Sequence, residues 1–218
     1  MTRFPDDAWP LEESTWAAHL GGDREAAIQR AAQLRARFPT NQVGYRVAAV
    51  ALRETKRLDE IDALLREAMT RFPEADWPLV ESVWAAYASG VREAAILRAQ
   101  HLRARFPANE AGYRVAAVAL RESERFDEMD ALLREAMTRF PDEAWPLEES
   151  AWAAHLSGDW EEGARRAELL RARFPTRPAG YRVGIHALRR AKRPDEADAV
   201  RREAEIRFPE TAWTSAAN

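Results

Sequence analysis

Apolar residues follow a helical spacing along most of the chain, in short segments that end at glycine, proline or asparagine. In the segment 24–38, residues three or four apart repeat this apolar character and therefore share one face of a helix. These residues are Ala27, Ile28, Ala31, Leu34 and Phe38. The pattern predicts an all-α protein, in agreement with the abundance of Ala, Leu, Arg and Glu.

Residues with special backbone properties mark the expected helix ends. Pro10 suits the first turn of a helix over 9–20, because the backbone N–H that proline lacks would have no partner within the helix there. Gly21-Gly22 ends that helix. Asp23 is expected to cap the next helix, and Asn41 precedes the one after it. Each segment pair therefore predicts a helix, a short turn and a second helix.

The tripeptide Arg-Phe-Pro recurs every 34 residues, starting at Arg3, Arg37, Arg71, Arg105, Arg139, Arg173 and Arg207. Longer identities have twice that period, because residues 44–54 are repeated letter for letter at 112–122. A fixed period of this size is typical of stacked two-helix repeats. We expect a single domain over 1–218 with six repeats in three 68-residue pairs: 8–41, 42–75, 76–109, 110–143, 144–177 and 178–211, with 208–218 as a tail.

The double period has a packing reason. Large and small residues exchange places on the second helices of neighbouring repeats, which lets side-chain layers interdigitate. The pairs are Ala31 and Leu34, Leu65 and Ala68, Ala99 and Leu102, and Leu133 and Ala136. The last second helix, about Pro194 to Arg207, instead carries Arg201 and Glu205, so we expect it to be a polar cap.

The period and several residues resemble the tetratricopeptide repeat family over nearly the whole chain. We number each repeat so that the proline of Arg-Phe-Pro is position 32. Small residues then stand at position 20 as Ala27, Ala95 and Gly163, and aromatic residues at position 4 as Tyr45, Tyr113 and Tyr181. The resemblance implies a right-handed α-solenoid that binds proteins or peptides on its concave face.

The overall charge and composition exclude several classes. A net charge of −3 does not suit a protein that coats nucleic acid. The uncharged runs are too short to span a bilayer, and the start of the chain has no signal-peptide pattern. Because cysteine is also absent, we expect a cytoplasmic protein without disulfides or thiolate metal sites.

No residue pattern predicts catalysis. The four histidines, His19, His101, His155 and His186, are not spaced for shared metal ligation on a helix. Glycine-rich phosphate loops and nucleophile elbows are also absent. We expect no catalytic, cofactor-binding or metal-binding residues, and therefore a protein that is not an enzyme.

The resemblance does imply a peptide-binding face, formed by positions 2, 5, 9, 12 and 13 of each repeat. Tryptophan or arginine occupies many of these positions, so aromatic and cationic ridges would alternate. The expected peptide-binding residues are Trp9, Trp16, His19, Arg46, Arg53, Trp77, Trp84, Tyr87, Arg114, Arg121, Trp145, Trp152, His155, Arg182 and Arg189. An alternative interpretation places the tryptophans in the core between first helices, because such stripes are more often buried than exposed.

We therefore expect a scaffold that binds a protein or peptide, with arginines orienting its acidic groups. One alternative is self-assembly into a homo-oligomer, and another is a regulatory or substrate-presenting region of a larger enzyme such as a glycosyltransferase. The near-identical pairs indicate either recent duplication or construction from a repeated cassette.

Overall fold

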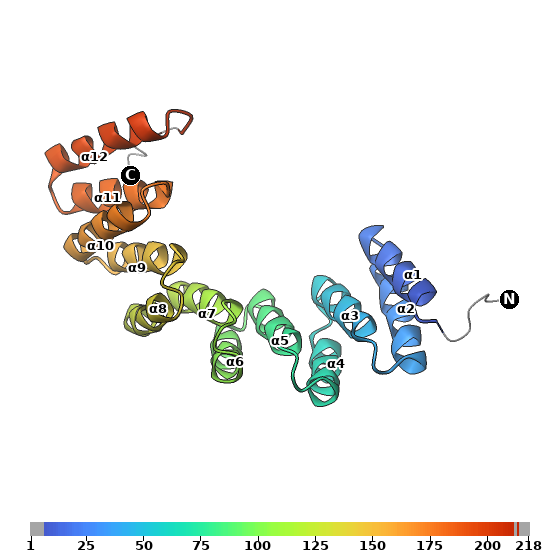
Figure 1. Cartoon of the computed structure of the whole chain (residues 1–218). Helices are drawn as coiled ribbons and strands as arrows, with labels where there is room; N and C mark the ends of the chain where they lie inside the picture. The colour runs from blue at the N-terminus through green and yellow to red at the C-terminus, as the bar shows by residue number, and fades with distance from the viewer. Residues whose placement is uncertain (1–6, 212, 214–218) are drawn as a thin grey trace. The chain divides into compact units, whose positions relative to one another are not determined.

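The computed structural model describes residues 7–211 and 213, and all regular elements in this part of the chain are α-helices (Figure 1). The chain forms two compact units, Met1–Ala119 (unit 1) and Leu120–Asn218 (unit 2), which are described separately. Helix α7 (Ala111–Glu122) contributes to both. Unit 1 otherwise contains α1 (Trp9–Leu20), α2 (Arg24–Arg37), α3 (Gln42–Glu54), α4 (Leu58–Arg71), α5 (Trp77–Ala88) and α6 (Arg92–Arg105). Unit 2 otherwise contains α8 (Phe126–Arg139), α9 (Trp145–Leu156), α10 (Trp160–Arg173), α11 (Pro178–Arg190) and α12 (Pro194–Arg207).

The predicted helix boundaries are confirmed where the sequence contains a cap or a breaker. The Asp23 carboxylate accepts a hydrogen bond from the Ala26 backbone N–H at 3.0 Å, and the Asn41 side chain accepts one from Val43 at 2.9 Å. Gly22 has φ +83°, a conformation that costs glycine little and reverses the chain after α1. The bounds of α12 agree with the predicted Pro194 to Arg207.

Within each unit the helices pack in consecutive helix-turn-helix pairs. Helix α1 contacts both α2 and α3, and α3 contacts α5, so the first helices of successive repeats touch one another. In unit 2, α9 contacts α10 and α11 in the same way. This arrangement is that of an α-solenoid, and the predicted all-α fold class is confirmed.

The core contains the residues that alternate in size between neighbouring second helices. Ala31 and Leu34 on α2 are fully buried, as are Leu65 and Ala68 on α4.

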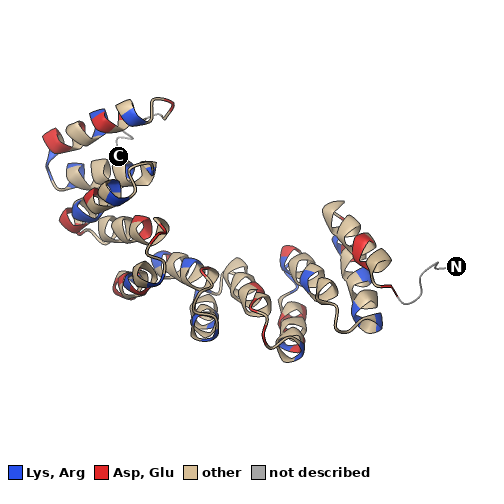
Figure 2. Cartoon of the chain, viewed as in Figure 1, with Lys and Arg blue, Asp and Glu red and all other residues tan. Residues whose placement is uncertain are grey.

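Charged residues of both signs lie along the helices of each unit (Figure 2). Arg201 of α12 stands at the repeat position that Leu65 occupies in α4. Leu65 is fully buried, whereas Arg201 forms an ion pair with Glu205 at 2.7 Å. None of the helices in the described part of the chain combines the length and apolar character that crossing a bilayer requires.

The Arg-Phe-Pro tripeptide joins successive repeats. The Phe72 ring lies 5.3 Å from the ring of Tyr45 in its own repeat and 6.4 Å from that of Trp77 in the next. The arginine contributes a second link, since Arg207 donates to the Pro175 carbonyl of the preceding tripeptide at 3.3 Å. Arg105 makes the equivalent bond to Pro73. The tripeptide therefore both ends a helix and fastens it to a neighbouring repeat.

Candidate functional site

The tryptophans at repeat position 2 are mainly interior residues. Trp77 and Trp145 are 8% and 5% exposed, and Trp77 Nε1 donates to the Gln42 side chain at 2.8 Å. The predicted tail lies partly outside the described residues, but Trp213 within it packs against Tyr181. Trp9 is the exception, at 63% exposed. Trp77 and Trp145 therefore lie buried in the core and offer little surface to a ligand.

The tryptophans at repeat position 9 are more accessible. Trp16 and Trp84 are each 38% exposed, and Trp152 is half-buried. Each ring meets an aromatic residue three positions later edge-on: Trp16 lies 6.0 Å from His19, and Trp84 lies 6.1 Å from Tyr87. These contacts hold the indoles in place while part of each ring remains open to solvent.

Two of the arginines at repeat position 12 form ion pairs between successive first helices, whereas the third, Arg189, lies 3.8 Å from Asp198 on α12. Arg53 lies 3.1 Å from Glu81, and Arg121 lies 2.5 Å from Glu149. Burial raises the pKa of Glu81, and the nearby guanidinium groups of Arg53 and Arg46 oppose that rise. Arg53 and Arg121 thus have a structural role in joining repeats.

The arginines at repeat position 5 are more exposed. The Arg46 guanidinium lies 5.9 Å from the centroid of the Trp77 ring, and that of Arg182 lies 5.9 Å from the Trp213 ring. Both lie in the geometry of a cation–π contact. Arg114 pairs with Glu110 at 2.8 Å. Arg46 therefore presents a cationic group beside the buried indole of Trp77, and Arg182 presents one beside the half-buried indole of Trp213.

These side chains form a first-helix face, which we define separately in each unit. In unit 1 it comprises Trp16, Arg46, Val50, Trp84 and Tyr87, on α1, α3 and α5. In unit 2 it comprises Trp152, His155, Arg182, His186 and Arg189, on α9 and α11. The predicted site residues that are not included in these faces are the exposed Trp9, the half-buried His19, the buried Trp77 and Trp145, and the ion-paired Arg53, Arg114 and Arg121.

The fold also brings together groups that the sequence separates. The rings of His155 and His186 lie 6.2 Å apart, and His186 lies 6.1 Å from Trp152. Spacing along a single helix could not reveal this cluster, since the two histidines belong to α9 and α11. Among the described residues, no group of three or more His, Asp or Glu side chains is arranged to hold a metal ion.

Glu81 and Glu149, the partners of Arg53 and Arg121, are interacting residues that the sequence did not predict. A signal for them exists, because each glutamate follows its arginine by 28 residues. The structure shows why the spacing is constant, because consecutive first helices are in contact and bring each arginine next to the glutamate 28 residues later.

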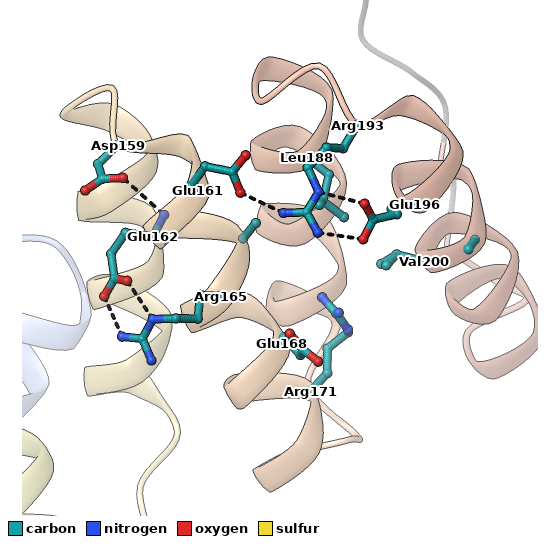
Figure 3. Close-up of a pocket in the computed structure, with 12 residues that line it drawn as sticks. Asp159, Glu161, Glu162, Arg165, Glu168, Arg171, Leu188, Arg193, Glu196 and Val200 are labelled. Atoms are coloured by element: carbon teal, nitrogen blue, oxygen red, sulfur yellow. Dashed lines mark hydrogen bonds and ion pairs between the residues drawn. The ribbon is translucent and has the colours of Figure 1, made fainter.

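A cavity of about 660 Å³ lies on the second-helix side of unit 2, between α10 and α12 (Figure 3). Several of its charged groups form ion pairs with one another. Arg193 pairs with Glu161 and Glu196, each at 2.6 Å, while Glu162 pairs with Arg165 at 2.6 Å. Hydrogen bonds from Arg165 and Arg166 lower the pKa of Glu162 to about 2, chiefly through Arg165.

The same arrangement recurs in unit 1. Arg57 pairs with Glu25 at 3.0 Å and with Glu60 at 2.6 Å. Since equivalent residues form the same bridge in another repeat, the network of Figure 3 is a link between repeats and is not a strong candidate for ligand binding.

Comparison with known proteins identifies a shared fold. No protein-family model matches the sequence, and no curated protein matches it either. Among solved structures, PilW, a type IV pilus biogenesis factor, aligns with a TM-score of 0.66 and 13% identity, over 94% of this chain and 95% of PilW. A tetratricopeptide repeat protein from Parabacteroides merdae aligns with a TM-score of 0.67 and 13% identity, over 92% of this chain and 79% of its own. YrrB, described as a TPR protein with an unusual peptide-binding site, aligns with a TM-score of 0.60 and 10% identity, over 83% and 93% respectively.

Proposed function

We propose that this chain, which has the fold of tetratricopeptide repeat proteins, is a non-enzymatic scaffold that binds a peptide or protein segment on its first-helix face. The observation that carries the proposal is the partial exposure of Trp16 and Trp84 at equivalent positions of α1 and α5. Tryptophan is costly to leave in water, and it dominates the energetics of many interfaces.

The neighbouring groups suit an extended segment with acidic side chains. Arg46 is exposed between the two tryptophan-bearing helices, and its guanidinium can bind a carboxylate through two parallel hydrogen bonds. Val50 and Tyr87 add partly buried apolar surface to the same face. Indoles would anchor the segment, and Arg46 would set its register.

A peptide array tests this proposal, with members that contain Asp or Glu matched to members that contain Asn or Gln. We expect the wild type to prefer acidic members. The Trp16→Ala/Trp84→Ala variant should bind its best peptide more weakly by about 2 kcal/mol or more, roughly 30-fold, because hot-spot residues typically cost this much on truncation.

Two further variants sharpen the test. Leu97→Ala removes an apolar side chain of 54% exposure from α6, a second helix, and should leave peptide binding unchanged. Arg46→Ala should reduce the preference for acidic over neutral peptides. Undiminished binding by the double tryptophan variant would contradict the assignment of the face.

A further inference from the structure

The third pair of repeats departs from the first two at three positions that the fold brings together. Trp160 stands where the earlier pairs have Arg24 and Arg92. Arg190 replaces Glu54 and Glu122, and His186 replaces Val50 and Val118. All three changes lie around the C-terminal end of α9, in unit 2.

In unit 1 the equivalent place is closed by opposite charges. Arg24 forms an ion pair with Glu54, and its guanidinium also donates to the His19 carbonyl. In unit 2 the arginine, Arg190, belongs to the first helix α11, and the residue opposite it on the second helix α10 is Trp160 instead of a carboxylate. The Arg190 guanidinium instead lies 5.2 Å from the centroid of the Trp160 ring. The exchange turns a neutral pair into a cation over an aromatic surface.

A cavity of about 580 Å³ occurs at this place. Its lining contains no carboxylate: it is made by His155, Leu156, Ser157, Gly158, Trp160, His186, Arg189 and Arg190. The nearest acidic partner of a lining residue is Asp198 on α12, 3.8 Å from Arg189 and shared with Arg201 at 3.4 Å. The cavity therefore has two guanidinium groups and two imidazoles around it.

One imidazole of the pocket has an unsatisfied nitrogen, as does His19 at the equivalent position of the first pair. The Nδ1 atom of His155 is buried and has no hydrogen-bond partner among the described residues. Burial lowers the pKa of His155, as do His186 and Arg190, and burial together with Arg189 lowers that of His186. An anion in the cavity would offset the positive charges and provide an acceptor for protonated imidazoles.

We propose that this pocket binds a phosphate group, either free or as a monoester. Arg189 and Arg190 balance its two negative charges, His155 and His186 donate to its oxygens, and Trp160 packs against the group attached to an ester. A dianion suits the site better than a single carboxylate because two guanidinium groups and two protonatable imidazoles surround it. The pocket shares His155, His186 and Arg189 with the first-helix face of unit 2, but small anions test it independently of peptide binding.

The binding should depend on pH with a definite sign. Arg189 and Arg190 on α11 are the charged groups that act on the two imidazoles, and Asp198 on α12 pairs with Arg189. Beside Trp160 the chain also carries Asp159, Glu161 and Glu162, of which Glu161 pairs with Arg193 and Glu162 with Arg165. Near pH 7 the imidazoles of the free protein are mainly neutral, because their pKa values lie below the ordinary 6.5. An anion raises those pKa values, so affinity increases as pH falls, by up to about tenfold per pH unit for each proton taken up with the ligand.

Inorganic sulfate is the first probe, since it stays a dianion from pH 8 to pH 5 and any pH dependence then belongs to the protein. The imidazole NMR resonances provide the readout. We expect sulfate to shift His155 and His186, to raise both their pKa values, and to leave the exposed His101 on α6 unchanged. Sulfate without effect on His155 and His186 at 20 mM would overturn the proposal.

The chain provides its own matched variant. The Trp160→Arg/His186→Val/Arg190→Glu variant restores the residues of the first pair, which already fold together in unit 1. We expect it to bind sulfate at least tenfold more weakly, while Arg202→Gln, which lowers the net charge by the same single unit on the exposed side of α12, keeps wild-type affinity. Equal losses in the two variants would show general charge attraction and overturn the pocket. Should the triple variant fail to fold by circular dichroism, Arg190→Gln supplies the same comparison.

Two phosphate probes identify the source of the anion. Phenyl phosphate that binds more tightly than inorganic phosphate would indicate a monoester, with its ring on Trp160. Equal affinities would indicate free phosphate. Acetate that binds as tightly as inorganic phosphate at pH 7 would contradict the preference for a dianion and overturn the proposal.

Discussion

At the scale of single residues, arginine has the main structural role, since it connects repeats at fixed positions. Arg98 donates to both carboxylate oxygens of Asp62, at 2.8 and 2.7 Å, and to the Ser82 carbonyl at 3.1 Å. It thereby links α4, α5 and α6. In unit 2, Arg166 bonds Asp130 and the Ser150 hydroxyl in the same manner. A planar guanidinium suits this role because several donors point in fixed directions.

We expect Arg98→Ala to lower the free energy of unfolding by about 1–2 kcal/mol, a range reduced for the partial exposure of the pair. Arg30→Ala is the matched control, because Arg30 donates to the Ser14 carbonyl at 2.7 Å and has no carboxylate partner among the described residues. It should cost clearly less. Urea unfolding of both variants provides the measurement, and equal losses would show that the link to Asp62 contributes nothing.

At the scale of helices, glycine sets how closely elements approach. A Cβ atom on Gly44 would lie 3.0 Å from the Ala31 carbonyl oxygen, a backbone atom that cannot move without shifting α2. At Gly184 the atom in the way is the flexible end of the Arg171 side chain. The repeat itself shows that alanine fits there, since Ala48 stands at the equivalent position of α3.

These two glycines should respond to alanine with opposite signs. Gly44→Ala should lower stability by about 1–3 kcal/mol, because it overpacks the contact between α2 and α3. Gly184→Ala should raise stability by up to about 1 kcal/mol, because it removes backbone freedom from the unfolded chain. Thermal unfolding of the two variants measures the signs, and destabilisation by both would contradict the distinction between backbone and side-chain neighbours.

At the scale of the whole molecule, the contacts within each unit join helices that are near in the chain. Helix α4 contacts α3 and α5, and α10 contacts α9 and α11. In such repeat proteins stability is approximately a sum of terms between nearest neighbours. Damage to one repeat should therefore remain local.

Hydrogen exchange measures how far such damage spreads. Leu65→Ala removes a fully buried side chain of α4 and should cost about 2–5 kcal/mol there. We expect faster exchange in α3, α4 and α5 and unchanged exchange in α10 to α12. Leu170→Ala, at a fully buried position of α10, should give the reverse pattern. Uniform loss of protection by either variant would indicate a single cooperative structure.

The helices and their boundaries were predictable because their causes are local. Asp23 and Asn41 cap helices through bonds to residues two or three positions away, and Pro39 ends a helix through its own geometry. The repeat period then predicts the pairing of helices. The fold of the two units follows from these signals without knowledge of any distant contact.

The sequence by itself thus determined the all-α repeat fold and the residues that share a helix face. Tertiary structure alone decided which of those faces is open. Trp77 and Trp84 lie seven residues apart on α5, yet the contact of Trp77 with Phe72 of the preceding repeat buries it while Trp84 stays partly exposed. His155, Trp160, His186 and Arg190 likewise form a pocket only because α9, α10 and α11 meet. Exposure and clustering depend on which helices become neighbours, and periodicity within one helix carries no information about its neighbours.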